Sequence, residues 1–266
     1  AGQNQFNIHV LIWASLTTLF LQILSNLAND YGDARSGADN DDRQGPRRMI
    51  QSGKISLKQM KKAVAITSAM ALISGSTLII VSLKGHHLVA FIFFIMGISA
   101  IAAAIRYTVG KNPYGYRGLG DLYVFIFFGI MGVGGTFFLH TGTWQWPVLL
   151  PATAIGLFST GVLNLNNIRD IEGDRKSGKK TLPVLMGRGK AAVYHLALLT
   201  AGWIMLMNWT VFYAPQTEGW LLLLILPVFI NNALSVFRYE QPSSRLDKEL
   251  RNLSLGTLLA VLLYGT

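Results

Sequence analysis

The sequence predicts an all-α protein, a polytopic bundle of transmembrane helices, on three observations. Of its 266 residues, 51% are hydrophobic and only 14% are charged, whereas soluble domains carry about a quarter charged residues. The uncharged stretches recur at the length of a membrane span, which is about 20 residues for a helix. Lysine and arginine residues are concentrated in every second connection between these stretches. A soluble helical protein leaves this recurrence unexplained, and a β-barrel would show alternating ten-residue segments instead.

The positions of the uncharged stretches predict eight membrane spans. The first span lies within Ala1–Asn29, which has no charge, and the longest uncharged stretch, 122–168, is divided in two by "HTGTWQWP" at 140–147. The two tryptophans of this turn are typical of a membrane interface. We expect spans near 8–29, 63–83, 88–107, 121–139, 147–168, 191–213, 219–237 and 252–266.

Basic residues predict the orientation of these spans. The seven connections hold 8, 1, 3, 0, 7, 0 and 4 lysines and arginines in chain order, so the positive-inside rule places the first, third, fifth and seventh in the cytoplasm. The net charge of +10 then reflects topology and attraction to anionic lipid of the bilayer. Nucleic-acid binding is not expected, because the chain has no separate basic domain.

Two acidic motifs share one pattern. "NDYGDARSG" begins at Asn29 and "DIEGDRKSG" begins at Asp170, 141 residues later, and three predicted spans separate their host spans. Each has an oxygen ligand, an Asp four positions on (Asp33, Asp174), and then Ser-Gly. This repeat predicts a single domain built of two halves, about 7–140 and 145–266, whose pseudo-symmetry brings the two motifs together.

The spacing within each motif predicts a metal site. Residues i and i+4 share a helix face, so Asn29 lies beside Asp33, and Asp170 beside Asp174. Oxygen ligands without His or Cys suit Mg²⁺, which substrate phosphates commonly complete. One such motif alone would be interpreted as acids that solvate a helix end, but two copies in register favour catalytic metal ligands. Further candidate contacts to a phosphorylated substrate are Asn26, Asp30, Arg48, Asn166, Asn167, Arg169 and Lys180.

The third connection, "IRYTVGKNPYGYRGLGDLYVF" at 105–125, is short and rich in Tyr and Gly. Its three tyrosines could form the wall of an aromatic substrate pocket, with two nearby bases for a carboxylate or phosphate. An interfacial aromatic belt around a tight turn explains the same residues equally well. The candidates are Tyr107, Lys111, Tyr114, Tyr116 and Arg117.

These loops together resemble the UbiA-type superfamily of intramembrane aromatic prenyltransferases, over essentially the whole chain. The stretches that carry the resemblance are "LQILSNLANDYGDARSGAD", "YTVGKNPYGYRGLGD", "LNLNNIRDIEGDRKSGKKTLPVLMG" and, more weakly, "IQSGKIS". The interval of six residues from Asp33 to Asp39, with "PYGYRGLGD", is similar to the branch that acts on 1,4-dihydroxy-2-naphthoate in menaquinone biosynthesis. The 4-hydroxybenzoate branch has a four-residue interval, and this chain has Gly37 there.

The resemblance implies a fold and an activity. The fold is a nine-helix bundle around a central cavity, so that the eight predicted spans correspond to a chain lacking the family's first helix. Asn29, Asp33, Asp170 and Asp174 match the Mg²⁺–diphosphate positions, and Asp39 completes the first motif. The implied reaction is the Mg²⁺-dependent transfer of a polyprenyl group from polyprenyl diphosphate to dihydroxynaphthoate, with loss of carboxylate. The implied location is the bacterial inner membrane, with the acidic loops in the cytoplasm.

Three alternatives remain at the level of sequence. The aromatic acceptor could be 4-hydroxybenzoate, or the enzyme could be another lipid–phosphate transferase that uses the same metal chemistry. A cation-coupled membrane transporter belongs to a different class, since some transporters also combine a repeat with acids near helix ends. Transporters place ionisable groups near the bilayer midplane, however, and here charged residues fall only at the ends of predicted spans, as Arg106 and Asp121 do.

Overall fold

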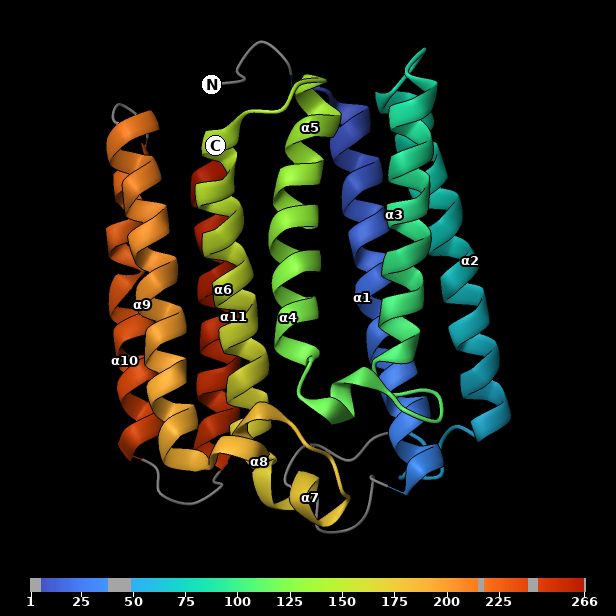
Figure 1. Cartoon of the computed structure of the whole chain (residues 1–266), viewed down its shortest axis with the longest axis vertical. Coiled ribbons are helices and arrows are strands. Elements are labelled where there is room, and N and C mark those ends of the chain that lie inside the picture. Colours follow the sequence, from blue (N-terminus) through green and yellow to red (C-terminus); the bar gives the residue numbers. More distant parts are fainter. Residues whose placement is uncertain (1–5, 38–48, 215–217, 239–243, 266) are drawn as a thin grey trace. The chain divides into compact units, whose positions relative to one another are not determined.

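The structure is a computed structural model that describes residues 6–37, 49–214, 218–238 and 244–265, and these residues contain helices and no strands (Figure 1). The prediction of an all-α multi-pass membrane protein is confirmed. The longer helices are α1 (Ile8–Ser36), α2 (Leu57–Ser82), α3 (His87–Arg106), α6 (Leu149–Arg169), α9 (Arg188–Tyr213), α10 (Leu226–Arg238) and α11 (Ser244–Gly265). The shorter ones are α4 (Gly120–Val124), α5 (Thr136–Thr141), α7 (Ile171–Lys176), α8 (Leu182–Met186), η1 (Tyr114–Arg117), η3 (Trp146–Val148), η4 (Glu218–Leu224) and the π-helical η2 (Phe125–Gly135).

Every predicted span coincides with helix, and six helices of the described residues are long and apolar enough to cross a membrane. The other two predicted spans differ from a simple spanning helix for physical reasons. The segment near 219–237 is divided into η4 and α10, and Pro227 lies in the first turn of α10, where a missing backbone N–H is tolerated. Helix α11 begins at Ser244, eight residues before the predicted start, and its first two turns carry charged side chains.

The described chain forms two compact units, each with its own core. The first contains α1, α2, α3, the segment up to Arg117 and α5. Helix α1 packs against α2 and α3 (Figure 1), and the buried side chains of one cluster come from α1, α2 and α5 and from Leu83, which follows α2. These buried residues are Val10, Ala14, Leu78, Leu83 and Leu139.

The second unit contains α4 and α6 to α11. Helix α6 packs against α9 and α11, and three rings meet at the centre of the core. Phe158 of α6 lies 4.7 Å from Phe229 of α10 and 6.0 Å from Trp203 of α9, between ring centroids. The predicted pseudo-symmetry between halves 7–140 and 145–266 stays a prediction.

Glycine brings η2 close to α6. A Cβ added at Gly129 would lie 2.5 Å from the carbonyl oxygen of Ala152 and 2.8 Å from Cα of Gly156, so no larger residue fits without a shift. This small-residue contact is typical of transmembrane helix pairs. It explains the glycines at positions 129 and 156.

A buried polar chain joins the last three long helices. Nε2 of His195 on α9 lies 2.9 Å from Oδ1 of Asn232 on α10, and Nδ2 of Asn232 donates to the carbonyl oxygen of Glu249 on α11 at 2.8 Å. His195 and Asn232 are fully buried. These hydrogen bonds fix the rotation of three helices whose remaining contacts are largely apolar.

Candidate active site

The first acidic motif lies on the last two turns of α1. The helix continues beyond the predicted end of the span as far as Ser36, so Asn29 and Asp33 are one turn apart on one face, as predicted. Asp33 is 2% exposed. Its Oδ1 accepts a hydrogen bond from the hydroxyl of Tyr116 at 2.5 Å, and that hydroxyl also lies 3.0 Å from Oγ of Ser36.

Gly32 allows α1 to approach the segment that follows α3. The hydroxyl of Thr108 donates to the carbonyl oxygen of Ala28 at 2.9 Å and lies 3.4 Å from Oδ1 of Asn29. A Cβ added at Gly32 would lie 2.5 Å from Oγ1 and 2.7 Å from the carbonyl oxygen of Thr108. The glycine of the first motif is therefore required by this contact, which holds Asn29 and Asp33 against the connection that carries the tyrosines.

The tyrosines of that connection have different partners. The rings of Tyr107 and Tyr114 meet edge to face, 5.4 Å apart, and the Tyr114 hydroxyl donates to the carbonyl oxygen of Ala103 at 2.9 Å. Gly115 is buried against Tyr107, whose carbonyl oxygen would lie 2.7 Å from an added Cβ. Tyr116 is therefore the tyrosine that the fold brings to the acidic motif, and the wall of an acceptor pocket stays a prediction.

The second acidic motif lies where α6 gives way to α7. Asp170 separates the two helices, and the backbone N–H of Asp174 donates to the carbonyl oxygen of Asp170 at 2.8 Å, which keeps the two residues one turn apart. Asp170 and Asp174 are buried. Nζ of Lys179 lies 3.7 Å from Oδ1 of Asp174.

Arg169 is buried beside Asp170, and its guanidinium donates hydrogen bonds along each of its edges. Nε and Nη2 form a fork on the two carboxylate oxygens of Asp170, at 3.0 and 2.8 Å. Nη2 also donates to Oδ1 of Asn166 at 2.8 Å, and Nη1 donates to Oδ1 of Asp247 at 2.8 Å. Arg169 is only 5% exposed, so its donors are directed into the protein rather than toward solvent.

The two motifs end in the same local structure. Oγ of Ser36 donates to the carbonyl oxygen of Asp33 at 3.1 Å, and Oγ of Ser177 donates to the carbonyl oxygen of Asp174 at 3.1 Å. The glycines that follow, Gly37 and Gly178, have φ of 75° and 76°, which is a left-handed conformation that glycine adopts without strain. The sequence repeat is thus matched by a repeat of backbone and hydrogen bonds.

The other predicted contacts are placed as follows. Asn26, Lys111, Arg117 and Lys180 are exposed, Asn29, Asp30 and Asn166 are half-buried, and Asn167 is buried. Asp39 and Arg48 lie outside the described residues.

The described residues contain no group of three or more His, Cys, Asp or Glu that could hold a metal ion by itself. Each motif brings two oxygen-bearing side chains together, which is less than the octahedral coordination of Mg²⁺. The donors are nevertheless oxygens alone, as Mg²⁺ prefers. The two motifs belong to different units, and their assembly into one site stays a prediction.

Sequence reasoning did not single out two acids, of which Asp247 contacts a functional candidate. Asp247 was counted in a cytoplasmic loop, yet it binds Arg169. Asp121 is 6% exposed and hydrogen-bonds the hydroxyl of Tyr194, while its Oδ2 has no partner among the described residues. The spacing of Leu246, Leu250 and Leu253, typical of a helix, was the signal that residues 244–251 belong to α11.

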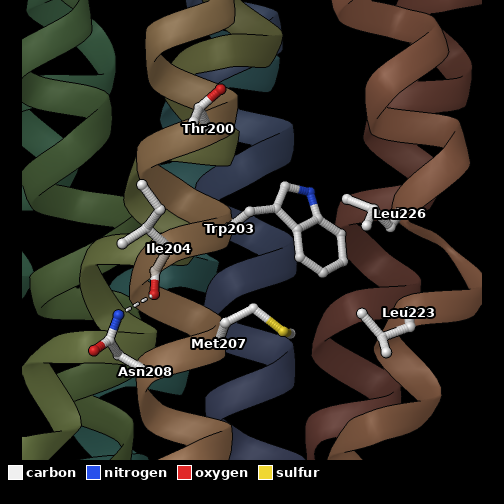
Figure 2. A pocket seen from close by; sticks show the side chains of 7 residues that line it. All are labelled: Thr200, Trp203, Ile204, Met207, Asn208, Leu223 and Leu226. Carbon is white, nitrogen blue, oxygen red and sulfur yellow. Dashed lines mark hydrogen bonds between the residues drawn. The ribbon is translucent and has the colours of Figure 1, made fainter.

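An apolar groove of about 310 Å³ lies on α9, η4 and α10. Figure 2 shows the indole of Trp203 and the side chain of Met207 between α9 and the leucines across the groove. No charged side chain lines it, so it does not suit a diphosphate. It suits hydrocarbon, such as a lipid or prenyl chain. Its lining residues are Thr200, Trp203, Ile204, Met207, Asn208, Leu223 and Leu226.

Known proteins are similar to this chain in sequence and in fold. Residues 1–256 match the model of the UbiA prenyltransferase family. A Haemophilus influenzae protein described as 1,4-dihydroxy-2-naphthoate octaprenyltransferase is 42% identical over 265 residues, 100% of this chain and 85% of the relative. An Escherichia coli protein of the same description is 44% identical over 264 residues, 98% of this chain and 85% of the relative.

A solved structure gives the same fold. The apo structure of a UbiA homolog from Aeropyrum pernix K1 matches with a TM-score of 0.72 at 18% identity, over 98% of this chain and 89% of that one. At this identity the likeness supports the fold alone. Together with the family model and the two bacterial relatives, it leads to one conclusion: the chain belongs to the UbiA prenyltransferase family and is a polyprenyltransferase.

Proposed function

We propose that this enzyme transfers a polyprenyl group from a polyprenyl diphosphate to 1,4-dihydroxy-2-naphthoate, with loss of the carboxylate and with Mg²⁺ as cofactor. The observation that carries the proposal is the matched local structure of two oxygen-only motifs in a chain whose relatives are described as acting on this acceptor. The positive-inside rule supports placing both motifs at the cytoplasmic face of the bacterial inner membrane.

Asn29 and Asp33 of one motif, and Asp170 and Asp174 of the other, are the proposed Mg²⁺ ligands. Carboxylate and amide oxygens fit this ion, and the diphosphate of the substrate would complete its coordination. Bound Mg²⁺ would supply positive charge that stabilises the leaving diphosphate. Asp39 is proposed as a further ligand of the first motif.

The protein's own side chains orient these ligands. The hydroxyl of Tyr116 fixes one oxygen of Asp33, and the guanidinium of Arg169 fixes both oxygens of Asp170. The exposed bases Lys111, Arg117 and Lys180 are proposed to attract the anionic groups of the substrates to this face.

The proposed reaction breaks the bond between the allylic carbon and the diphosphate oxygen, and the electron pair leaves with diphosphate. An electron-rich carbon of the naphthoate ring then forms a bond to the allylic carbon, and carbon dioxide leaves the ring. The hydrocarbon chain remains among apolar side chains during the transfer, for which the groove at Trp203 is one candidate. Excluding water protects the allylic cation from hydrolysis.

The direct test is an assay on membranes that contain the protein, Mg²⁺ and a polyprenyl diphosphate. We expect a prenylated product from dihydroxynaphthoate, none in the presence of EDTA, and little or none from 4-hydroxybenzoate. A preference for 4-hydroxybenzoate would reassign the acceptor, and full activity in EDTA would remove Mg²⁺ from the proposal.

Variants of the two motifs test whether both are needed. Asp33→Asn and Asp174→Asn keep the size of the side chain but remove its charge, and each should lower kcat by at least about 100-fold, in the range that loss of one strong transition-state contact produces. Glu172→Gln is the matched control within the second motif, because Glu172 forms an exposed pair with Arg175 at 2.9 Å. Near-normal turnover by either Asp variant would contradict the paired site.

A further inference from the structure

We propose that Asp247, on the first turn of α11, is a positioning residue that fixes the carboxylate of Asp170 through Arg169. The inference rests on the proposed role of Asp170 at the diphosphate site and extends it to a helix that no motif includes. The three residues form one line of hydrogen bonds, from Asp247 through the guanidinium of Arg169 to Asp170, with every link between 2.8 and 3.0 Å.

The contact between Arg169 and Asp170 determines the plane of the carboxylate. Two parallel N–H···O bonds hold both carboxylate oxygens, which is the geometrically most specific contact that arginine makes. One lone-pair direction of each oxygen then remains for a ligand on the far side. Any rotation of the guanidinium would rotate the carboxylate with it, so the orientation of Asp170 depends on what holds Arg169.

Asp247 and Asn166 hold the remaining edges of the guanidinium. Nη1 is directed to Asp247 and Nη2 is shared between Asn166 and Asp170. Because Arg169 is 5% exposed, water is a poor substitute for a lost partner, and a buried donor without an acceptor is costly to leave in place. Of these two partners only Asp247 is charged, so it adds a second ion pair to the one that Arg169 makes with Asp170.

Helix α11 holds Asp247 in place. Leu246 and Leu253 are fully buried in the core of the second unit, and the carbonyl oxygen of Glu249 accepts from the buried amide of Asn232. These contacts flank Asp247 on both sides in the sequence. Its own side chain is 40% exposed, so replacement by Asn removes the charge and converts one of the two acceptor oxygens to a donor without leaving a cavity.

A purely structural role predicts something different. If the pair only ties α6 to α11, its loss lowers stability and every activity in parallel. If Asp247 positions Asp170, its loss weakens metal binding specifically, since residues that orient a metal ligand typically change metal affinity by about 10- to 100-fold. The proposal therefore concerns metal affinity in a protein that remains folded.

The experiment measures Mn²⁺ binding by electron paramagnetic resonance, in the presence of inorganic diphosphate, to the detergent-purified full chain. We expect the Kd for Mn²⁺ to rise about tenfold in Asp247→Asn and to return most of the way in Asp247→Glu, with little change in thermal stability for either variant. The Mg²⁺ concentration for half-maximal turnover should shift in the same way. Glu172→Gln should match the unchanged protein in all three measurements.

The outcomes separate this inference from the proposed function. Unchanged Mn²⁺ binding in Asp247→Asn, with binding lost in Asp170→Asn, would overturn the positioning role and leave the metal site intact. Unchanged binding in Asp170→Asn would overturn the metal site itself. A loss of binding in Asp247→Asn that equals its loss of stability, without rescue by Asp247→Glu, would show a structural tie only and would also overturn the positioning role.

Discussion

At the scale of single residues, the hydroxyl of Tyr116 distinguishes this tyrosine from its neighbours because it donates to a buried carboxylate. A hydrogen bond to a charged group contributes roughly 1.5–3 kcal/mol. Tyr116→Phe removes the donor and keeps the ring, so we expect kcat/KM for the prenyl diphosphate to fall about tenfold or more. Steady-state kinetics at saturating Mg²⁺ would measure this effect.

The control for that variant is Tyr213→Phe. Tyr213 lies at the end of α9, half exposed and stacked on Trp209, so its hydroxyl has no role in the site. Equal losses in the two variants would argue that the Tyr116 hydroxyl does not orient Asp33.

Gly32 is the second residue whose identity has a specific cause. In Gly32→Ala the added methyl would meet Thr108 at 2.5 Å, and a forced adjustment of this kind costs about 1–3 kcal/mol. We expect a lower melting temperature in detergent and weaker activity, because the adjustment displaces Asn29 and Asp33. Gly97→Ala in α3 is the matched control, since its added Cβ would meet no atom within 4 Å. A fully stable and active Gly32→Ala would contradict the close approach.

Residue types at the two motifs could be predicted from the sequence, but their partners could not. The i, i+4 spacing and the Ser-Gly ending can be recognised in the sequence. In the structure the paired residues of each motif lie one turn apart, and the two endings have the same local structure. That Thr108 faces Gly32, or that Asp247 reaches Arg169, depends on contacts between residues 76 and 78 positions apart. No short-range pattern encodes such contacts.

At the scale of helices, the buried chain of His195, Asn232 and Glu249 joins α9, α10 and α11. Asn232→Ala removes the amide that bonds both neighbours and leaves their polar groups buried. Interhelical hydrogen bonds in membranes contribute about 0.6 kcal/mol on average and at most about 1.7, so we expect a loss of stability near the upper value. Unfolding in a mixed-detergent titration would measure it.

The adjacent asparagine provides the control for that variant. Asn231 is exposed, and the distance from its Nδ2 to Oε1 of Glu249 is long for a hydrogen bond, at 3.5 Å. Asn231→Ala should therefore change stability by a few tenths of a kcal/mol at most, as is usual for surface substitutions. If the two alanine variants were equally stable, the buried chain would not hold the three helices together.

Positions of helices followed from the sequence more reliably than their ends. Charge-free stretches mark spans because hydrocarbon excludes charge, and all eight fall on helix. Charges do not mark where a helix ends, however, because a helix can leave the bilayer and continue. For this reason α1 extends past Asn29 to Ser36, and α11 begins at Ser244 among charged residues.

At the scale of the whole molecule, the two nine-residue motifs show the repeat, but the division of the chain into two compact units does not follow it. The two units do not coincide with two contiguous segments, because α4 belongs to the second unit and α5, in the same predicted span, belongs to the first. An uncharged stretch is interpreted as one span even where its two ends pack against different helices. Only the pattern of contacts assigns the two ends to different units.

The continuity of α1 has a mechanical consequence. Its uncharged part, Ile8–Asn29, is about 33 Å long at the usual rise per residue, close to the thickness of a bilayer core, which is about 30 Å. Asp33 lies on the same uninterrupted helix. A thicker or thinner bilayer changes the tilt of such a helix and thereby moves Asp33 relative to the membrane surface.

We therefore expect turnover in liposomes to pass through a maximum as the acyl chains of the lipid are lengthened from about 14 to about 22 carbons, near the thickness that matches α1. The measurement is the initial rate at fixed Mg²⁺ and substrate-to-lipid ratio. Inserting Gly-Gly between Ala28 and Asn29 would uncouple the membrane-spanning part of α1 from the carboxylate of Asp33. Any activity that remained should no longer depend on the length of the acyl chains. A flat profile for the unaltered enzyme would exclude the coupling. A maximum would instead add membrane thickness to Mg²⁺ and substrate as a variable that sets the rate of this enzyme.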